Sequence, residues 1–251
     1  MWNFSGKKVL VTGGSRGIGR ACVIAFAKSG ADVAINYNKS EEEALKVMEI
    51  ARTFSNSQIF KADTSKFDQV NAMVADVVKY FGKIDILVNN AGVLRRTPFL
   101  EITESEWDYI IDVNLKGYFL VSQAVAKQMV EQNTGGAIVN ISSNNQERAS
   151  MLVAHYNASK AGVAMLMKTM ANELAPYRIR VNNVAPGLTE TDINRKDIAN
   201  KEWIEGRLSR IPLKLVAKPE DITGAVLFLA SDDAKLATGS TVWVDAGATI
   251  S

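Results

Sequence analysis

The chain has little cysteine and little histidine. Its 251 residues include one of each, Cys22 and His155. A disulfide requires two cysteines, and a structural zinc site requires about four Cys or His ligands, so a single chain supplies neither. We therefore expect no zinc site and no disulfide, and no motif indicates a metal site, although a carboxylate-bound magnesium is not excluded. Any chemistry must come from an organic cofactor and from hydroxyl, amine and carboxylate groups.

The chain also lacks an excess of one charge and lacks long apolar runs. Its 29 Lys and Arg against 27 Asp and Glu leave a formal net charge of +2, which is too even for a protein that binds a polyanion. No uncharged apolar stretch approaches the roughly 18 residues of a membrane span, and the first eight residues lack the apolar core of a signal peptide. We expect a cytoplasmic protein whose partners include neither nucleic acid nor a membrane.

Short apolar runs rich in β-branched residues alternate with longer amphipathic stretches. Apolar runs without internal alternation indicate strands buried on both faces, as in a parallel sheet. The alternation predicts one α/β domain over residues 1–251, with a doubly wound seven-stranded parallel sheet and helices on both faces. The expected strands are Val9–Thr12, Asp32–Asn36, Gln58–Lys61, Ile84–Asn89, Ala137–Ser142, Ile179–Ala185 and Thr241–Asp245, and the expected helices are Gly17–Ser29, Glu41–Phe54, Lys66–Phe81, Ser105–Gln132, Ala154–Ala175 and Pro219–Ala230.

The least regular segment runs from about residue 187 to 215. It mixes polar and apolar residues between the sixth expected strand and the last expected helix. In an open α/β sheet, loops at the carboxyl ends of the strands line the ligand crevice. We therefore expect residues 187–215 to form a substrate lid.

A glycine-rich turn, Thr12-Gly13-Gly14-Ser15-Arg16-Gly17-Ile18-Gly19, joins the first expected strand to the first expected helix. Glycines at 13, 17 and 19 allow a tight turn and let backbone N–H groups approach a pyrophosphate. The helix N-terminus adds its partial positive charge. At the start of a βαβ unit, this pattern predicts a dinucleotide-phosphate site rather than an ordinary turn.

Tyr156 and Lys160 lie four residues apart in a helical stretch, which places them on one face, one turn apart. A free phenol titrates near 10, too high for an acid–base catalyst at neutral pH. A neighbouring ammonium stabilises the phenolate and lowers that pKa. Ser142 ends the fifth expected strand, where its hydroxyl could hold a substrate oxygen. Tyr-x-x-x-Lys alone is usually incidental, but with this serine and the glycine turn it predicts a catalytic site.

These motifs together resemble the classical short-chain dehydrogenase/reductase family over essentially the whole chain. The G-x-x-x-G-x-G turn, Asn89-Asn90-Ala91-Gly92, Ser142 and Tyr156-x-x-x-Lys160 occur in the family's order. The resemblance implies a Rossmann fold, a homotetramer, and an NAD(P)-dependent oxidoreductase that interconverts a secondary alcohol and a carbonyl compound by hydride transfer.

The resemblance also implies a role for each catalytic residue. Tyr156 would donate or remove the hydroxyl proton, and Ser142 would orient the substrate oxygen. Lys160 would lower the pKa of the tyrosine and contact the nicotinamide ribose. Asn114 would expose a backbone carbonyl, at a kink in its helix, to a water linked to the lysine. His155 is expected to be a pocket wall or a packed helix contact, and Cys22 a buried helix residue.

The second strand bears on the choice of dinucleotide. An acidic residue at its end would hold both ribose hydroxyls and repel a 2′-phosphate, but Asn36 occupies that place. Arg16 and Lys39 offer cationic partners to a phosphate. We expect NADP to be preferred, with NAD also permitted. The expected cofactor-binding residues are Gly13, Ser15, Arg16, Gly17, Ile18, Gly19, Asn36, Asn38, Lys39, Ser40, Asp63, Thr64, Asn89, Ala91, Gly92, Tyr156, Lys160, Pro186, Gly187, Leu188 and Thr191.

Three residues at the strand ends, Asp63, Asn89 and Asn90, have a structural role as an alternative to a cofactor contact. Asp63 is placed to accept from the adenine amine or to cap the helix before Thr64-Ser65, and both roles can hold. The amides of Asn89 and Asn90 can contact the cofactor or tie adjacent strands together.

The substrate is expected to be a small alcohol or carbonyl compound. The amide-rich segment 142–146 matches a hydroxylated substrate, and segments 155–160 and 191–194 are similar to glucose and sugar dehydrogenases. A sugar, polyol or small ketone is therefore preferred.

Two alternatives remain. The first is a 3-oxoacyl carrier-protein reductase, which segment 187–193 also resembles, although Glu131-Gln132-Asn133 and Asn172 stand where the docking arginines of those enzymes would fall. The second is a dinucleotide-sensing regulatory protein. Such relatives typically lose the catalytic serine, tyrosine or lysine, whereas this chain has all three.

Overall fold

The computed structural model describes residues 2–250, apart from the side chain of Lys196. Within this range, seven parallel strands form one sheet in the order β3-β2-β1-β4-β5-β6-β7. The order reverses between β1 and β4, which is the switch point where ligands bind in such sheets. The predicted doubly wound sheet is confirmed. The strands are β1 (Lys8–Val11), β2 (Asp32–Tyr37), β3 (Ser57–Lys61), β4 (Ile86–Asn89), β5 (Gly136–Ile141), β6 (Ile179–Pro186) and β7 (Thr241–Val244).

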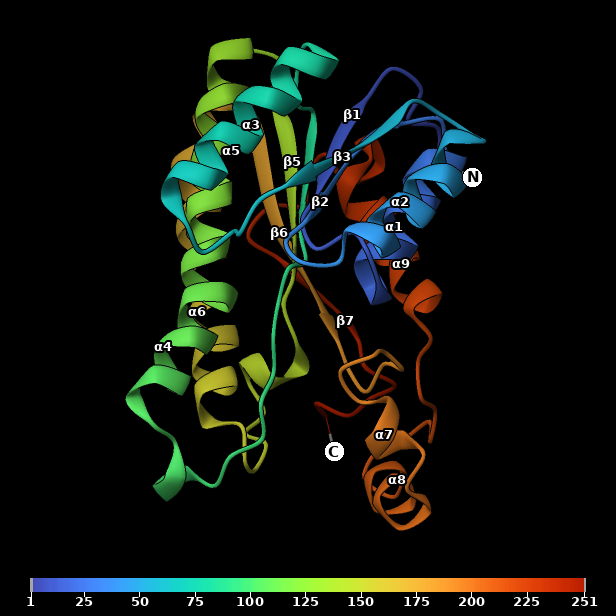
Figure 1. Cartoon of the computed structure of the whole chain (residues 1–251), viewed down its shortest axis with the longest axis vertical. Coiled ribbons are helices and arrows are strands. Elements are labelled where there is room, and N and C mark those ends of the chain that lie inside the picture. Colours follow the sequence, from blue (N-terminus) through green and yellow to red (C-terminus); the bar gives the residue numbers. More distant parts are fainter. Residues whose placement is uncertain (1, 251) are drawn as a thin grey trace.

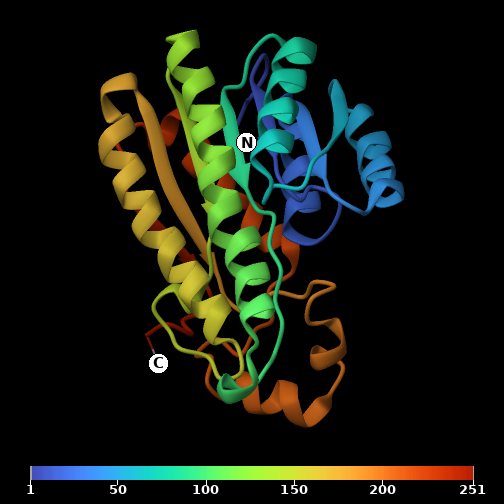
Figure 2. The same ribbon diagram turned by 60° about the vertical axis from the view of Figure 1, so that its left-hand side comes forward.

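Helices cover both faces of the sheet (Figure 1). On one face lie α1 (Gly17–Lys28), α2 (Glu41–Arg52) and α9 (Pro219–Ala230), and on the other lie α3 (Phe67–Phe81), α5 (Gly117–Gln132) and α6 (Ala154–Leu174). Alternate side chains of β1 enter the two cores, with Val9 and Val11 in the first and Leu10 in the second. Figure 2 shows α5 and α6 side by side along the sheet.

The expected helix Ser105–Gln132 is divided into three parts. It begins as α4 (Glu104–Ile111), widens into a π-helical turn, η2 (Asp112–Lys116), and continues as α5. The side chain of Asn114 in this turn is fully buried and exchanges two hydrogen bonds of 2.8 Å with the backbone of Val93. Such π-turns recur at functional sites. The expected helix therefore runs on without a gap, and the π-turn lies where the family resemblance implied a kink, at Asn114.

The segment expected to be irregular contains two helices, α7 (Arg195–Ile198) and α8 (Lys201–Leu208). The Asn200 side chain accepts from the Trp203 backbone N–H at 3.0 Å and so caps the start of α8. No residue of α8 is fully buried, so this helix has no apolar stripe that periodicity could detect. The segment extends beyond the sheet at the lower end of Figure 1, opposite α4.

The remaining elements are short 3₁₀ turns, namely η1 (Phe99–Glu101), η3 (Asn144–Gln146), η4 (Ala175–Tyr177) and η5 (Asp232–Ala234).

Within residues 2–250, no helix is long and apolar enough to cross a bilayer.

Candidate active site

Lys160 brings a cationic group into the interior between α6 and β5. Its side chain is buried, and Nζ donates to the Ile141 carbonyl at 2.9 Å and to the Tyr118 hydroxyl at 3.3 Å. Nζ lies 5.7 Å from the ring centroid of Tyr156, one helical turn before it. Burial lowers the pKa of Lys160 to about 7. The structure therefore brings the expected tyrosine and lysine together and adds Tyr118, which the sequence did not suggest.

The serine beside the phenol is Ser143. Burial raises the pKa of Tyr156, and a hydrogen bond with the Ser143 side chain acts against that rise. The Ser142 hydroxyl instead donates to the Val184 carbonyl of β6 at 3.1 Å. Successive side chains of an extended chain point to opposite sides, so only one of the two serines can face the tyrosine. This geometry corrects the prediction that named Ser142.

Asn114 supports the site from the π-turn. Besides its bonds to Val93, its Nδ2 donates to the Ser159 hydroxyl on α6 at 3.4 Å. The side chain therefore ties the loop after β4 to the helix that carries Tyr156 and Lys160. The expected role of its backbone carbonyl stays a prediction.

His155 is a helix contact rather than a group facing the reaction. Its ring is fully buried, and Nδ1 accepts from the Tyr156 backbone N–H at 2.9 Å, which leaves the proton on Nε2. Nε2 lies 3.2 Å from the carboxylate of Glu106 on α4. Hydrogen bonds from Thr97 and His155 hold the pKa of Glu106 below its ordinary value. This agrees with the expectation of a packed contact.

Two asparagines hold the glycine turn in place. Asn36 is buried, accepts from the Gly13 N–H at 3.2 Å, and donates to the Ala62 carbonyl at 3.1 Å. Asn90 donates to the carbonyls of Thr12 and Gly13 at 3.0 and 3.1 Å. A Cβ on Gly19 would lie 2.3 Å from the Gly13 carbonyl oxygen, so this close packing requires glycine. Asn36 thus positions the turn, and a cofactor contact by its side chain stays a prediction.

Asp63 and Asn89 are also engaged within the protein. Burial acts to raise the pKa of Asp63, but hydrogen bonds from Ser65 and Asn38 and the charge of Lys66 outweigh it, so the pKa is lowered. Asp63 closes a turn onto Ser65, with bonds of 3.0 Å from N–H and 2.7 Å from the hydroxyl, rather than capping α3 itself. The side-chain amide of Asn89 on β4 donates to Asn140 on β5 and so joins the two strands, as expected.

A cleft of about 620 Å³ lies between the glycine turn, α2 and the segment after β6. Ser15, Arg16 and Gly17 line it on one side and Thr191 on the other. Gly17 opens α1 with φ +53°, and a Cβ there would point toward the Thr191 side chain at 3.4 Å. Free helix N–H groups, an arginine and open space suit the phosphates of a dinucleotide. These residues therefore fit a nicotinamide dinucleotide.

The other expected cofactor residues lie along the same edge of the sheet. Asn38 and Lys39 are exposed, whereas Thr64 is buried. By position, Ile18 is on α1, Asn38, Lys39 and Ser40 follow β2, Thr64 follows β3, Ala91 and Gly92 follow β4, and Pro186, Gly187 and Leu188 end or follow β6.

Known proteins resemble this chain along almost its whole length. A family model described as enoyl-(acyl carrier protein) reductase matches residues 13–249. The chain is 43% identical over 242 residues to a 3-oxoacyl-[acyl-carrier-protein] reductase of Staphylococcus aureus, covering 96% of this chain and 97% of the relative. It is 40% identical to an L-rhamnose 1-dehydrogenase (NAD(P)(+)) of Azotobacter vinelandii, covering 96% of each.

A solved structure also resembles this chain in fold. The gluconate 5-dehydrogenase of Burkholderia cenocepacia, in complex with NADP and tartrate, superposes with a TM-score of 0.93 at 35% identity, covering 99% of this chain and 97% of the other. The matching sequences, the shared fold and the paired tyrosine and lysine agree. The chain therefore belongs to the short-chain dehydrogenase/reductase family, as an NAD(P)-dependent oxidoreductase that acts on alcohol and carbonyl groups.

Proposed function

We propose that the enzyme interconverts a hydroxyl and a carbonyl group on a sugar, polyol or small ketone, with Ser143, Tyr156 and Lys160 at the reacting oxygen. The observation that carries this proposal is the arrangement of the Tyr156 phenol between the Ser143 hydroxyl and the buried Lys160 ammonium. Small hydroxylated compounds are favoured because the segment after β5 places Asn144, Asn145 and Gln146 next to that serine.

The nicotinamide ring supplies a hydride acceptor in oxidation and a hydride donor in reduction, so that R₂CHOH and NADP⁺ give R₂CO, NADPH and one proton. In oxidation Tyr156 Oη takes the hydroxyl proton of the substrate, and in reduction it returns a proton to the carbonyl oxygen. Ser143 donates a hydrogen bond to that oxygen and holds it. Protonated Lys160 stabilises the phenolate, against the rise in pKa that burial imposes on Tyr156.

NADP is proposed as the preferred cofactor. Arg16 lines the cleft at the glycine turn, and Lys39 is exposed after β2. Position 36, near the end of β2, is an asparagine rather than an acidic residue. The gluconate 5-dehydrogenase that superposes on this chain contains NADP. Arg16→Gln should weaken NADP binding about tenfold, measured by fluorescence titration, and leave NAD binding within about twofold. A wide preference of the unaltered enzyme for NAD would refute the proposal.

The test of function is cofactor absorbance with a panel of sugars, polyols and small ketones. We expect turnover that Tyr156→Phe lowers at least about a hundredfold, because general acid–base catalysis contributes that much. The variant should still bind NADP, which separates lost chemistry from lost folding. Full retention of turnover by Tyr156→Phe would contradict the mechanism. Tight NADP binding without turnover of any compound would favour a regulatory protein that senses the dinucleotide.

A 3-oxoacyl thioester is the second candidate substrate, because a 3-oxoacyl-[acyl-carrier-protein] reductase is 43% identical to this chain. Against it, the resemblance implies docking arginines where this chain has Glu131-Gln132-Asn133 and Asn172. The Gln132 side chain exchanges two 2.9 Å hydrogen bonds with the Ile84 backbone. Turnover of an oxoacyl thioester at a kcat/KM at least tenfold above every sugar, polyol and ketone would select this alternative.

The predicted homotetramer, cytoplasmic location and lid over residues 187–215 belong to the same proposal. Sedimentation equilibrium tests the first of these, with an expected mass near four times the 27.3 kDa of the chain. A monomer at micromolar concentration would rule out the tetramer.

A further inference from the structure

A second buried tyrosine, Tyr118, contacts the lysine of the candidate active site. It lies in the first turn of α5, directly after the π-turn, and is 2% exposed. Its hydroxyl donates to the Ile141 carbonyl at 2.8 Å and accepts from Lys160 Nζ at 3.3 Å. Nζ also donates to the same carbonyl at 2.9 Å. The phenol, the ammonium and the carbonyl therefore form a closed set of three hydrogen bonds.

Lys160 lies between two phenol rings. Its Nζ is 4.9 Å from the ring centroid of Tyr118 on α5 and 5.7 Å from that of Tyr156 on its own helix. Within residues 2–250, no carboxylate forms an ion pair with Lys160, and burial lowers its pKa to about 7. The groups that stabilise its charge are therefore the two phenols and the Ile141 carbonyl of β5.

The two phenols differ in how firmly they hold their protons. Burial and the nearby Tyr156 raise the pKa of Tyr118 well above its ordinary value, and its proton is bound to the Ile141 carbonyl. Burial also raises the pKa of Tyr156, but a hydrogen bond with Ser143 acts against that rise. Tyr118 therefore keeps its proton at neutral pH and serves Lys160 as an acceptor, whereas Tyr156 is the phenol that exchanges a proton.

We propose that Tyr118 is a positioning residue for the reaction, whose hydroxyl accepts a hydrogen bond from Lys160 and keeps the lysine charged beside Tyr156. This inference rests on the proposed function, because it assumes that the lysine acts on Tyr156. An acceptor stabilises an ammonium more than a neutral amine, since hydrogen bonds to charged groups are the stronger ones. Without the Tyr118 hydroxyl, more of Lys160 is neutral and unable to stabilise the phenolate.

The first test measures stability and needs no substrate. Tyr118→Phe removes the hydroxyl and keeps the ring, and the Ile141 carbonyl keeps Lys160 as a donor. The lost bond should lower the pKa of Lys160 by about one unit. Because the folded state then holds the lysine proton less firmly, the variant loses stability as the pH falls below about 8. In urea denaturation, its effect on the unfolding constant should be about fivefold larger at pH 6 than at pH 9.

Two further variants serve as controls for this pH dependence. In a protein that also carries Lys160→Met, the effect of Tyr118→Phe should be the same at both pH values. Tyr80→Phe removes a hydroxyl from an exposed position of α3, where it donates to Asn56 at 3.3 Å, and should likewise show no pH dependence. Equal effects of Tyr118→Phe at pH 6 and pH 9 in the unaltered background would overturn the proposal.

The second test measures catalysis across pH, with the best alcohol substrate and saturating NADP. The kcat of Tyr118→Phe should lie within about twofold of the unaltered enzyme at pH 6 and fall about tenfold below it at pH 9. The reason is that a shift of one unit in the pKa of Lys160 changes its charged fraction most above that pKa. KM should stay within about twofold, because both hydrogen-bond partners of Tyr118 lie within the protein.

A purely structural role for Tyr118 would give a different pattern. It would lower kcat equally at both pH values or raise KM, and either result would overturn the proposal, as would an unchanged kcat throughout. Tyr156→Phe provides the comparison, since it should lose activity at both pH values.

Failure of this inference can be told apart from failure of the proposed function. Turnover that requires Tyr156, without a pH-dependent effect of Tyr118→Phe, would refute the role of Tyr118 and leave the proposed function standing. A pH-dependent effect on stability without turnover of any alcohol or ketone would refute the proposed function, and with it the role of Tyr118 in the reaction, while the hydrogen bond to Lys160 would stand.

Discussion

At the scale of single residues, Lys160 links the stability of the protein to its catalysis. Its Nζ is held by the Ile141 carbonyl and the Tyr118 hydroxyl, and burial lowers its pKa to about 7. In the unfolded chain a lysine titrates near 10.4. Between these two values the unfolded state binds more protons than the folded state, so this residue makes stability rise as the pH increases from about 7 to 10.

Replacing Lys160 by Met should remove that dependence. We subtract the free energy of unfolding of the unaltered protein from that of Lys160→Met. This difference should be more positive at pH 6 than at pH 9 by about 3 kcal/mol, because one pKa unit corresponds to about 1.36 kcal/mol. Urea denaturation at the two pH values measures the difference, in which the other titrating groups cancel. A difference independent of pH would show that Lys160 is not a buried ammonium of lowered pKa.

At the scale of elements, buried asparagines join three neighbouring strands. Asn89 on β4 lies opposite Asn140 on β5, which lies opposite Asn183 on β6. Asn89 donates to Asn140, and Asn140 donates to Asn183, each at 3.0 Å. Because Asn89 leads into the loop that contacts the glycine turn, this chain of amides fixes the strand ends around the site.

Breaking the chain of amides at its middle should be costly. Asn140→Ala leaves both Asn89 Nδ2 and Asn183 Oδ1 without this partner in the interior, so we expect a loss of about 2–4 kcal/mol in the free energy of unfolding. The matched control is Asn71→Ala at an exposed position of α3, where the amide donates to the Phe67 carbonyl at 2.9 Å, with an expected change of about 0.5 kcal/mol. Equal effects of the two substitutions in urea denaturation would mean that the buried amides contribute nothing particular.

How much the sequence predicts also differs between elements. Strands with continuous apolar runs, such as Ile86–Asn89, are recognisable because burial on both faces leaves a strong signal. The π-turn at Asp112–Lys116 and the exposed helix α8 leave no comparable signal in the pattern of apolar residues. Ser142 and Ser143 are adjacent at a strand end, where a shift of one residue reverses which side chain faces the site.

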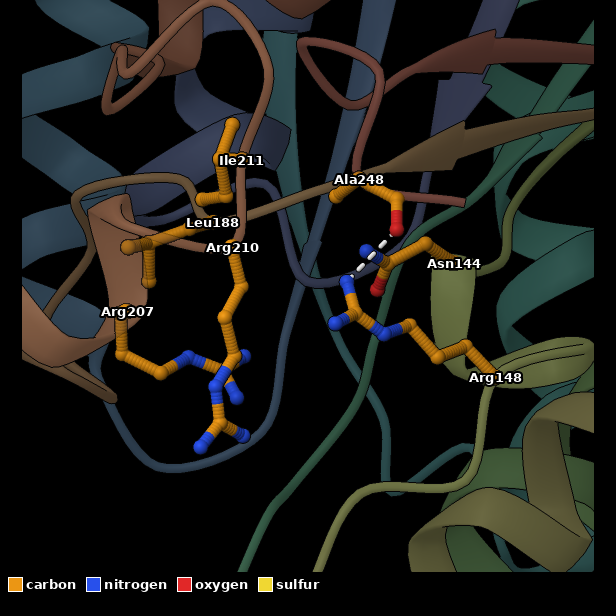
Figure 3. A pocket seen from close by; sticks show the side chains of 7 residues that line it. All are labelled: Asn144, Arg148, Leu188, Arg207, Arg210, Ile211 and Ala248. Carbon is orange, nitrogen blue, oxygen red and sulfur yellow. Dashed lines mark hydrogen bonds between the residues drawn. The ribbon is translucent and has the colours of Figure 1, made fainter. Parts of the chain in front are cut away.

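At the scale of the whole molecule, segments that are distant in the sequence lie together. Arg148 and Arg207 are far apart in the sequence, so no local pattern predicts that they line one small cavity (Figure 3). The loop after β4 reaches across the site to the segment after β6, where Arg96 pairs with Asp197 at 2.6 Å and lies over the Trp203 ring. This contact joins α7 and α8 to the loop after β4.

Weakening that contact should loosen the proposed lid. Asp197→Asn should increase amide hydrogen exchange over residues 195–208 about two- to fivefold, as expected for a half-exposed ion pair worth about 0.5–1 kcal/mol. Asp192→Asn is the matched control, because its ion pair with Arg195 lies in the same segment but is more exposed. Comparable exchange in the two variants would argue against a specific closing role for Arg96.

The pair of adjacent serines tests the catalytic centre most directly. Steady-state NADP-linked turnover of the best alcohol or ketone substrate should be compared for Ser143→Ala, Ser142→Ala and the unaltered enzyme. We predict that Ser143→Ala lowers kcat/KM about a hundredfold, because it removes the hydroxyl that hydrogen-bonds Tyr156. Ser142→Ala, which loses only the bond to the Val184 carbonyl, should stay within about threefold. The reverse order of the two effects would contradict the proposed catalytic centre.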